Sequence, residues 1–236
     1  YRYRPRINLQ DPVMKDMISP MENTVYFLPN SDARQSQIYF YIPMGDYNRE
    51  ENVRREAFNQ YISGGFSGLI MNEIREKNSM AYTAYGFASS RGLPGAQTYF
   101  SGYIDTQNDK AVDAIDLYMK LLTDMPERPG RIDNIKSYLR QSALTDHPDS
   151  RNLSLRIAEW KRRGYTDDPA KEELPLIDSL TFPDIVDYYQ KNIKGKPIII
   201  GVLGNPKDIS IDALKKFGKV IRLNEKKLFN EKDTMF

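Results

Sequence analysis

The chain has 236 residues, 40% of them hydrophobic and 28% charged, enough to build the core of one large domain or two small ones. The net charge of +2 is spread along the sequence in short basic runs flanked by acids, which predicts solvated helix faces and no nucleic-acid binding. The absence of Cys excludes disulfides, thiolate metal sites and cysteine nucleophiles.

No apolar run reaches the roughly 20 residues that a spanning helix needs, so we expect no membrane span. No secretory signal is recognisable at the amino terminus. The sequence does not begin with Met, so we expect a fragment of a longer polypeptide or a processed product. The chain is expected to be soluble, cytoplasmic or periplasmic, and the compartment stays unknown.

The first half of the chain predicts strands followed by two helices. Polar residues with prolines predict an extended arm or linker over residues 1–21. Aromatic and β-branched residues predict strands at 24–28 and 37–43. Helical spacing of apolar residues predicts a helix over 51–62, and it resumes with Phe66, Leu69, Ile70 and Ile74 to about residue 77. The glycine-rich joint between them lacks the Lys-Ser/Thr of a phosphate loop, and we expect it to let the two helices pack closely.

The second half begins with a predicted hairpin of strands 81–89 and 97–104. Amphipathic helices are expected next, at residues 108–125, 132–144 and 152–163. Asp167 and Asp168 before Pro169 indicate a loop with a helix start, and Thr181-Phe182-Pro183-Asp184 has the pattern of a capped helix start. Residues 197–203 are apolar without alternation, which predicts a buried strand. A short helix through Ile211 and Leu214 and a strand at 220–223 follow.

Strands and helices are clustered in the sequence and do not alternate, which predicts an α+β fold. We expect one two-layer domain over residues 22–224, with a mixed, largely antiparallel sheet and helices packed on one face. Residues 225–236 are expected to form a carboxyl-terminal tail.

The single histidine, His147, limits the hydrolytic chemistry available to the chain. Zinc hydrolases usually bind the metal through two or more imidazoles, and Ser-His-Asp sites need a His placed by tertiary contacts. Pro148 and the polar neighbours predict a helix end or turn, so we interpret His147 as a surface or capping residue. The 32 acidic residues leave room for a carboxylate-only metal site or an acid–base pair, but no short-spaced acidic cluster stands out. We therefore expect no catalytic residue and no metal site within the chain.

Residues 61–86 read YISGGFSGLIMNEIREKNSMAYTAYG and resemble a signature of pitrilysin/insulinase-type zinc metallopeptidases, a family that includes the mitochondrial processing peptidases. In that family a Gly-Gly-Phe-Ser joint leads to a Leu-Arg-Glu-Lys helix end and then to Ala-Tyr at the start of a strand. The flanking predicted elements occur in the family's order, so the resemblance covers residues 22–224.

The resemblance implies one of two similar halves that close over a chamber. The active half carries His-x-x-Glu-His, which binds zinc and activates water. That motif would fall on residues 51–62, where there is no His, so the chain resembles the non-catalytic half. The chain alone is expected to be inactive and to hold no cofactor. Zinc is expected in a partner half, on the same polypeptide or a separate subunit, and the substrate is expected to be a peptide.

The resemblance also implies two substrate-binding residues, an Arg and a Tyr seven residues later, which are Arg75 and Tyr82 here. A guanidinium offers forked donors to peptide carbonyls, and a phenol can donate to an oxygen on which negative charge develops. The alternative is structural, because Arg suits helix ends and Tyr packs well in strands.

In one respect the sequence departs from the family, whose joint usually reads Arg-Gly-Leu-Ala-Tyr. Here residues 78–82 read Asn-Ser-Met-Ala-Tyr. Since Asn tolerates positive φ, Asn78 is expected to form the turn.

Two functions remain open from the sequence. The chain is either the substrate-contacting half of a zinc metalloendopeptidase or a catalytically inert scaffold subunit with the same fold, like the core subunits of respiratory complexes.

Overall fold

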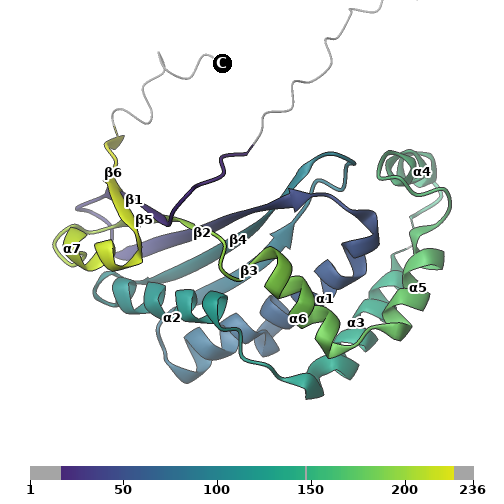
Figure 1. Ribbon diagram of the computed structural model, residues 1–236, viewed down its shortest axis with the longest axis horizontal. Helices are drawn as coiled ribbons and strands as arrows, with labels where there is room; N and C mark the ends of the chain where they lie inside the picture. The colour runs from purple at the N-terminus through teal and green to yellow at the C-terminus, as the bar shows by residue number, and fades with distance from the viewer. Residues whose placement is uncertain (1–16, 147, 226–236) are drawn as a thin grey trace, which may run out of the picture.

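The computed structural model describes residues 17–146 and 148–225 as one sheet with a layer of helices (Figure 1). The sheet has six strands in the order β3-β4-β2-β5-β1-β6. The strands are β1 Thr24–Pro29, β2 Gln35–Asp46, β3 Thr83–Ser89, β4 Gln97–Gln107, β5 Ile199–Gly204 and β6 Lys219–Arg222.

Most strand pairs are antiparallel, as the sequence predicts. Strands β3, β4, β2 and β5 pair antiparallel in that order, whereas β1 runs parallel to both β5 and β6. Side chains alternate along β2 and β4, with every second one buried against the helices. The predicted mixed, largely antiparallel sheet is confirmed.

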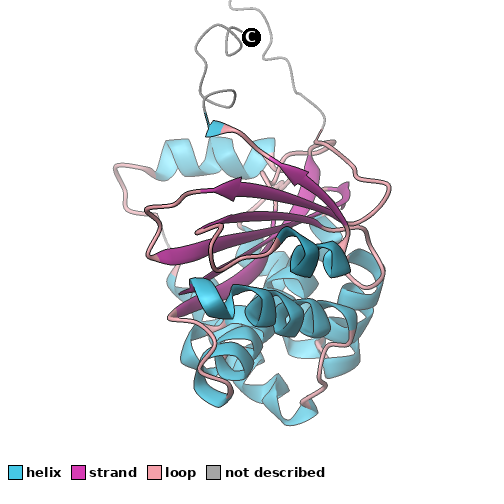
Figure 2. Cartoon of the chain, turned by 90° about the vertical axis from the view of Figure 1, so that its left-hand side faces the viewer, coloured by secondary structure: helices cyan, strands magenta, loops and turns pink. Residues whose placement is uncertain are grey.

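The α-helices lie mainly on one face of the sheet, and the opposite face is open (Figures 1 and 2). Their bounds are α1 Asn52–Ser63, α2 Ala111–Thr123, α3 Ile132–Thr145, α4 Leu153–Arg162, α5 Pro169–Ser179, α6 Phe182–Asn192 and α7 Ile211–Leu214. Helix α4 is the exception: it buries no residue and stands at one end of the molecule (Figure 1).

Short helical turns connect these elements. The ones with 3₁₀ geometry are η1 Arg49–Glu51, η2 Gly65–Ser67, η4 Asn108–Lys110, η5 Pro129–Arg131 and η6 Lys215–Phe217. The seven-residue segment η3, Met71–Lys77, is a π-helix, whereas the sequence predicts an ordinary α-helix there.

The glycine-rich joint packs closely against the end of α1, whereas close packing of α1 on η3 themselves stays a prediction. A Cβ added at Gly68 would lie 2.7 Å from the Cα of Ser63, so only glycine allows this approach. Leu69, Ile70 and Ile74 are fully buried, which confirms those positions of the predicted stripe. The Phe66 side chain and His147 lie outside the described part of the chain.

Two predicted elements differ from the structure. The predicted helix start at Pro169 is confirmed, and Asp168 caps it by accepting from the Ala170 amide. It begins a complete helix, α5, which the sequence did not predict. Strand β5 is buried on one face only, because Ile199 and Leu203 lie on the open face and are partly exposed. The predicted buried strand therefore exists, but only its helix-facing side is fully buried.

Candidate functional site

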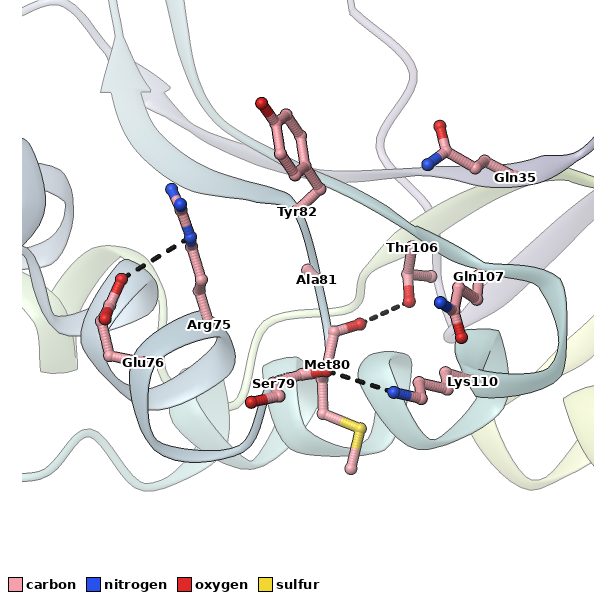
Figure 3. Close-up of a pocket in the computed structure, with 10 residues that line it drawn as sticks. All are labelled: Gln35, Arg75, Glu76, Ser79, Met80, Ala81, Tyr82, Thr106, Gln107 and Lys110. Atoms are coloured by element: carbon pink, nitrogen blue, oxygen red, sulfur yellow. Dashed lines mark hydrogen bonds and ion pairs between the residues drawn. The ribbon is translucent and has the colours of Figure 1, made fainter.

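A pocket of about 450 Å³ opens where η3 ends, β3 begins and β4 ends (Figure 3). Both sequence-predicted site residues line it. Its walls come from three stretches of the chain and include Gln35, Arg75, Glu76, Ser79, Met80, Ala81, Tyr82, Thr106, Gln107 and Lys110. It is the site that the sequence singled out, enlarged by residues from β2, β4 and η4.

Arg75 and Tyr82 come together at this pocket. The Arg75 guanidinium carbon lies 5.6 Å from the centre of the Tyr82 ring, and both side chains point to the same side of the segment (Figure 3). Arg75 Nε is 3.6 Å from Glu76 Oε1, a loose ion pair. Tyr82 is 73% exposed. Within the described residues neither the guanidinium nor the phenol makes a hydrogen bond, so their donors are available to a ligand.

The backbone between these two residues is fixed on both sides. The Met80 amide donates to the Ile74 carbonyl at 2.9 Å, and the Thr106 hydroxyl donates to the Met80 carbonyl. The Tyr82 amide donates to the Asp105 carbonyl at 3.0 Å, which joins the start of β3 to β4. The position of Tyr82 therefore follows from the sheet itself.

The turn after η3 is made by Ser79, and the expectation for Asn78 was wrong. Ser79 has φ 51, whereas Asn78 has φ −112 and stays in the right-handed region. Instead of turning the chain, the Asn78 side chain donates to the Glu73 carbonyl at 2.7 Å and caps the helix end. Ser79, at the position where the resemblance places glycine, therefore makes the turn.

Glu73 anchors the helical turn that presents Arg75. Its carboxylate accepts from Lys77 Nζ at 2.9 Å and from the Arg128 guanidinium, which also reaches Asn72 Oδ1 at 3.2 Å. The Glu73 side chain is largely buried, so this ion pair is screened less than the exposed ones. π-helical turns are rare and occur frequently at functional sites, in line with a functional role for this segment.

Two residues on the far walls of the pocket were not predicted from the sequence. Gln35 and Lys110 reach it from β2 and η4, and Lys110 Nζ lies 3.4 Å from the Ser79 carbonyl. Nothing local to these residues in the sequence marks them, because the pairing of β2 and of β3 with β4 brings them beside Tyr82.

The lining of this pocket holds one carboxylate, that of Glu76, and no imidazole or thiolate. No group of three or more His, Cys, Asp or Glu side chains that could hold an ion occurs in the described ranges. Nor does any described helix have the length and apolar character needed to cross a membrane.

The fold and pocket define a two-layer α+β domain that presents an exposed Arg–Tyr pair at the end of a π-helix. The family model described as the Peptidase M16 inactive domain matches residues 10–129. The chain belongs to this family and is a non-catalytic domain of the peptidase type, which confirms the resemblance seen in residues 61–86.

Solved structures share the fold at low sequence identity. A peptidase M16 inactive domain from Pseudomonas fluorescens matches with a TM-score of 0.66 and 15% identity, over 83% of this chain and 47% of that one. The periplasmic protease PqqL from Escherichia coli matches with a TM-score of 0.61 and 15% identity, over 79% of this chain and 21% of that one. A chain of complex III2 from Candida albicans matches with a TM-score of 0.60 and 13% identity, over 80% and 47%.

The chain therefore spans about half or less of the length of these structures. A search of curated proteins returns no match.

Proposed function

We propose that this chain is the substrate-contacting, non-catalytic half of a zinc metalloendopeptidase, with the zinc and its His-x-x-Glu-His motif supplied by another domain or subunit. The observation that carries the proposal is the exposed pair of Arg75 and Tyr82, whose donors have no hydrogen-bonding partner among the described residues. The family match and the protease neighbours support it.

Each residue has a distinct role in the proposal. The Arg75 guanidinium donates to backbone carbonyls of an extended peptide and holds it beside Tyr82, because its fork matches planar acceptors. The Tyr82 hydroxyl donates to the carbonyl oxygen on which negative charge develops during hydrolysis. Both side chains point away from the domain, as expected if the substrate lies between two halves.

The test uses the complete native protein that contains this chain, with a peptide substrate. Tyr82→Phe is expected to lower kcat by about 10²-fold, the cost of one lost oxyanion donor. Arg75→Ala is expected to raise KM and to lower kcat/KM. Arg222→Ala, an exposed arginine on β6, is the control and should leave both constants unchanged.

Full activity in both variants, with native stability, would refute the proposed roles. It would favour instead the inert assembly subunit, for which the likeness to the chain of complex III2 gives a precedent in fold alone. In that case the chain should co-purify with a stable complex, and Tyr82→Phe should not change its assembly.

A further inference from the structure

The open face of the sheet carries a row of tyrosines beside the pocket. Tyr85, Tyr103 and Tyr39 are cross-strand partners on β3, β4 and β2, and their ring centres are 5.3 and 5.0 Å apart. Gly201 of β5 continues the row without a side chain, and Tyr26 of β1 follows it. Tyr39 is 52% exposed and Tyr85 39%, so the described chain leaves these rings open to a ligand.

Asp105 lies beside the middle of this row, two residues from Tyr103 along β4 and on the same face of the sheet. Its cross-strand partners, Thr83 and Gln37, are both uncharged. Asp105 makes no ion pair within the described residues, and its Oδ1 is buried without a hydrogen-bond partner. Burial, and then the negative charge of Asp105, raise the pKa of Tyr103, so the carboxylate acts on the neighbouring ring.

An unpaired carboxylate among tyrosine rings favours a cation. A buried acceptor without a donor is unfavourable until a donor reaches it. The faces of the rings attract ammonium and guanidinium groups, and the aliphatic stems of Lys and Arg pack well on aromatic surface. The Asp105 side chain as a whole is only partly buried, and a half turn of its carboxylate exchanges the two oxygens. A donor arriving across the open face can therefore reach either oxygen.

The geometry also ties Asp105 to the proposed substrate site. The Asp105 carbonyl accepts from the Tyr82 amide at 3.0 Å, so the two residues are backbone neighbours on adjacent strands. A peptide held at Tyr82 has a side chain within reach of Asp105 when it points across the sheet.

We infer that Asp105, with the row of Tyr103, Tyr85 and Tyr39, forms a subsite for a Lys or Arg side chain of the bound peptide. The inference rests on the proposed function, because the peptide backbone is held by Arg75 and Tyr82. It names the chemical class that the proposed site selects: extended peptides with a basic residue next to the backbone contact.

The test compares two peptides of about ten residues that differ only at one central position, Arg or its neutral isostere citrulline. Binding is measured by fluorescence anisotropy on the complete native protein, with a metal chelator present so that no cleavage occurs. The wild type is expected to bind the Arg peptide roughly tenfold more tightly, the size of a desolvated cation–π contact joined to an ion pair. In Asp105→Asn the preference should fall to roughly threefold, the share left to the tyrosine rings, with unchanged affinity for the citrulline peptide.

Two further variants complete the design. Tyr103→Leu, which keeps the carboxylate and removes a ring, should lower the preference to roughly threefold. Asp46→Asn changes an exposed acid at the far end of β2 and should retain the wild-type preference. Thermal unfolding of each variant checks the fold.

The outcomes separate this inference from the proposed function. Equal binding of both peptides by the wild type, or an undiminished, roughly tenfold preference in Asp105→Asn, overturns the subsite and leaves the proposed function standing. Binding of neither peptide by the wild type overturns both. If Arg75→Ala weakens both peptides by the same factor, the backbone contact and the basic subsite are independent, as inferred.

Discussion

Ser79 holds a backbone conformation that costs free energy for any residue other than glycine. Its φ of 51 lies in the left-handed region, where a Cβ crowds the following carbonyl. Ser79→Gly is expected to raise the free energy of unfolding by about 0.5–1 kcal/mol. That gain is the left-handed penalty of about 1–2 kcal/mol less the roughly 0.4–1 kcal/mol of extra unfolded-state entropy.

Denaturant unfolding of Ser79→Gly beside Asn78→Gly provides a matched comparison, because the residues are adjacent. Asn78→Gly removes the hydrogen bond to the Glu73 carbonyl and should destabilise the chain by about 1 kcal/mol. A stabilising Asn78→Gly with a neutral Ser79→Gly would show that the turn belongs to Asn78 after all.

The turn and the Arg–Tyr pair show how far sequence reasoning reaches at the residue scale. The seven-residue spacing from Arg75 to Tyr82 lies within one stretch of sequence, so a motif could identify it. The choice between Asn78 and Ser79 could not be made, because it depends on the π-helical turn. A π turn takes one more residue than an α turn, which shifts the end of the helix along the chain.

Helix α6 begins with the cap that its sequence predicts, and this cap makes stability depend on pH. The Asp184 carboxylate accepts from the Thr181 amide at 2.9 Å and the Thr181 hydroxyl at 2.6 Å, and it pairs with Arg54 at 2.9 Å. Burial raises the pKa of Asp184, but these hydrogen bonds and the arginine outweigh burial, so the pKa lies below its ordinary value.

A carboxylate with a lowered pKa stabilises the fold above its unfolded pKa of about 3.9 and loses that effect as the pH falls through the folded value. Asp184→Asn is expected to lower the free energy of unfolding by about 1 kcal/mol at pH 7, as loss of a helix cap does. The difference in free energy of unfolding between Asp184→Asn and the wild type should narrow below about pH 4 and vanish as the pH falls through the folded pKa. Asp187→Asn, an exposed position on the same helix, is the control and should change stability little at either pH. A gap that stays constant down to acid pH would exclude the charge as its cause.

At the scale of elements, apolar periodicity predicted helices and strands well where one face of the element is apolar and the other polar. Helix α3 and strands β2 and β4 have such patterns and were predicted close to their observed bounds. Helix α5 was recognised only at its start, because Pro175 within it reads as a breaker. The apolar residues of β5 could not show that one face is open, since apolar side chains also occupy exposed surface.

At the scale of the whole molecule, the contact between the sheet and the helix layer centres on Tyr118 of α2. Two glycines, Gly86 and Gly102, face each other across β3 and β4 and leave room for its phenol. The phenol donates to the Tyr85 carbonyl at 2.9 Å, and the ring stacks on Phe40 at 4.0 Å. The helix layer therefore reaches through the core to β3, the strand that carries Tyr85 on the open face.

Gly102→Ala is expected to disturb the packing of the helix layer on the sheet. A Cβ at residue 102 would lie 2.1 Å from the Tyr118 hydroxyl and 2.7 Å from Cζ, and the fully buried ring has little room to move. Overpacking of this kind is expected to cost about 1–3 kcal/mol, measured by denaturant unfolding. Gly201→Ala is the matched control: it is also a strand glycine, but its Cβ would meet only the Tyr39 Cβ at 3.8 Å on the open face. Equal losses in the two variants would mean that strand glycines matter here for their flexibility. A loss confined to Gly102→Ala would show that the glycine pair is required by the fit of Tyr118 between the layers.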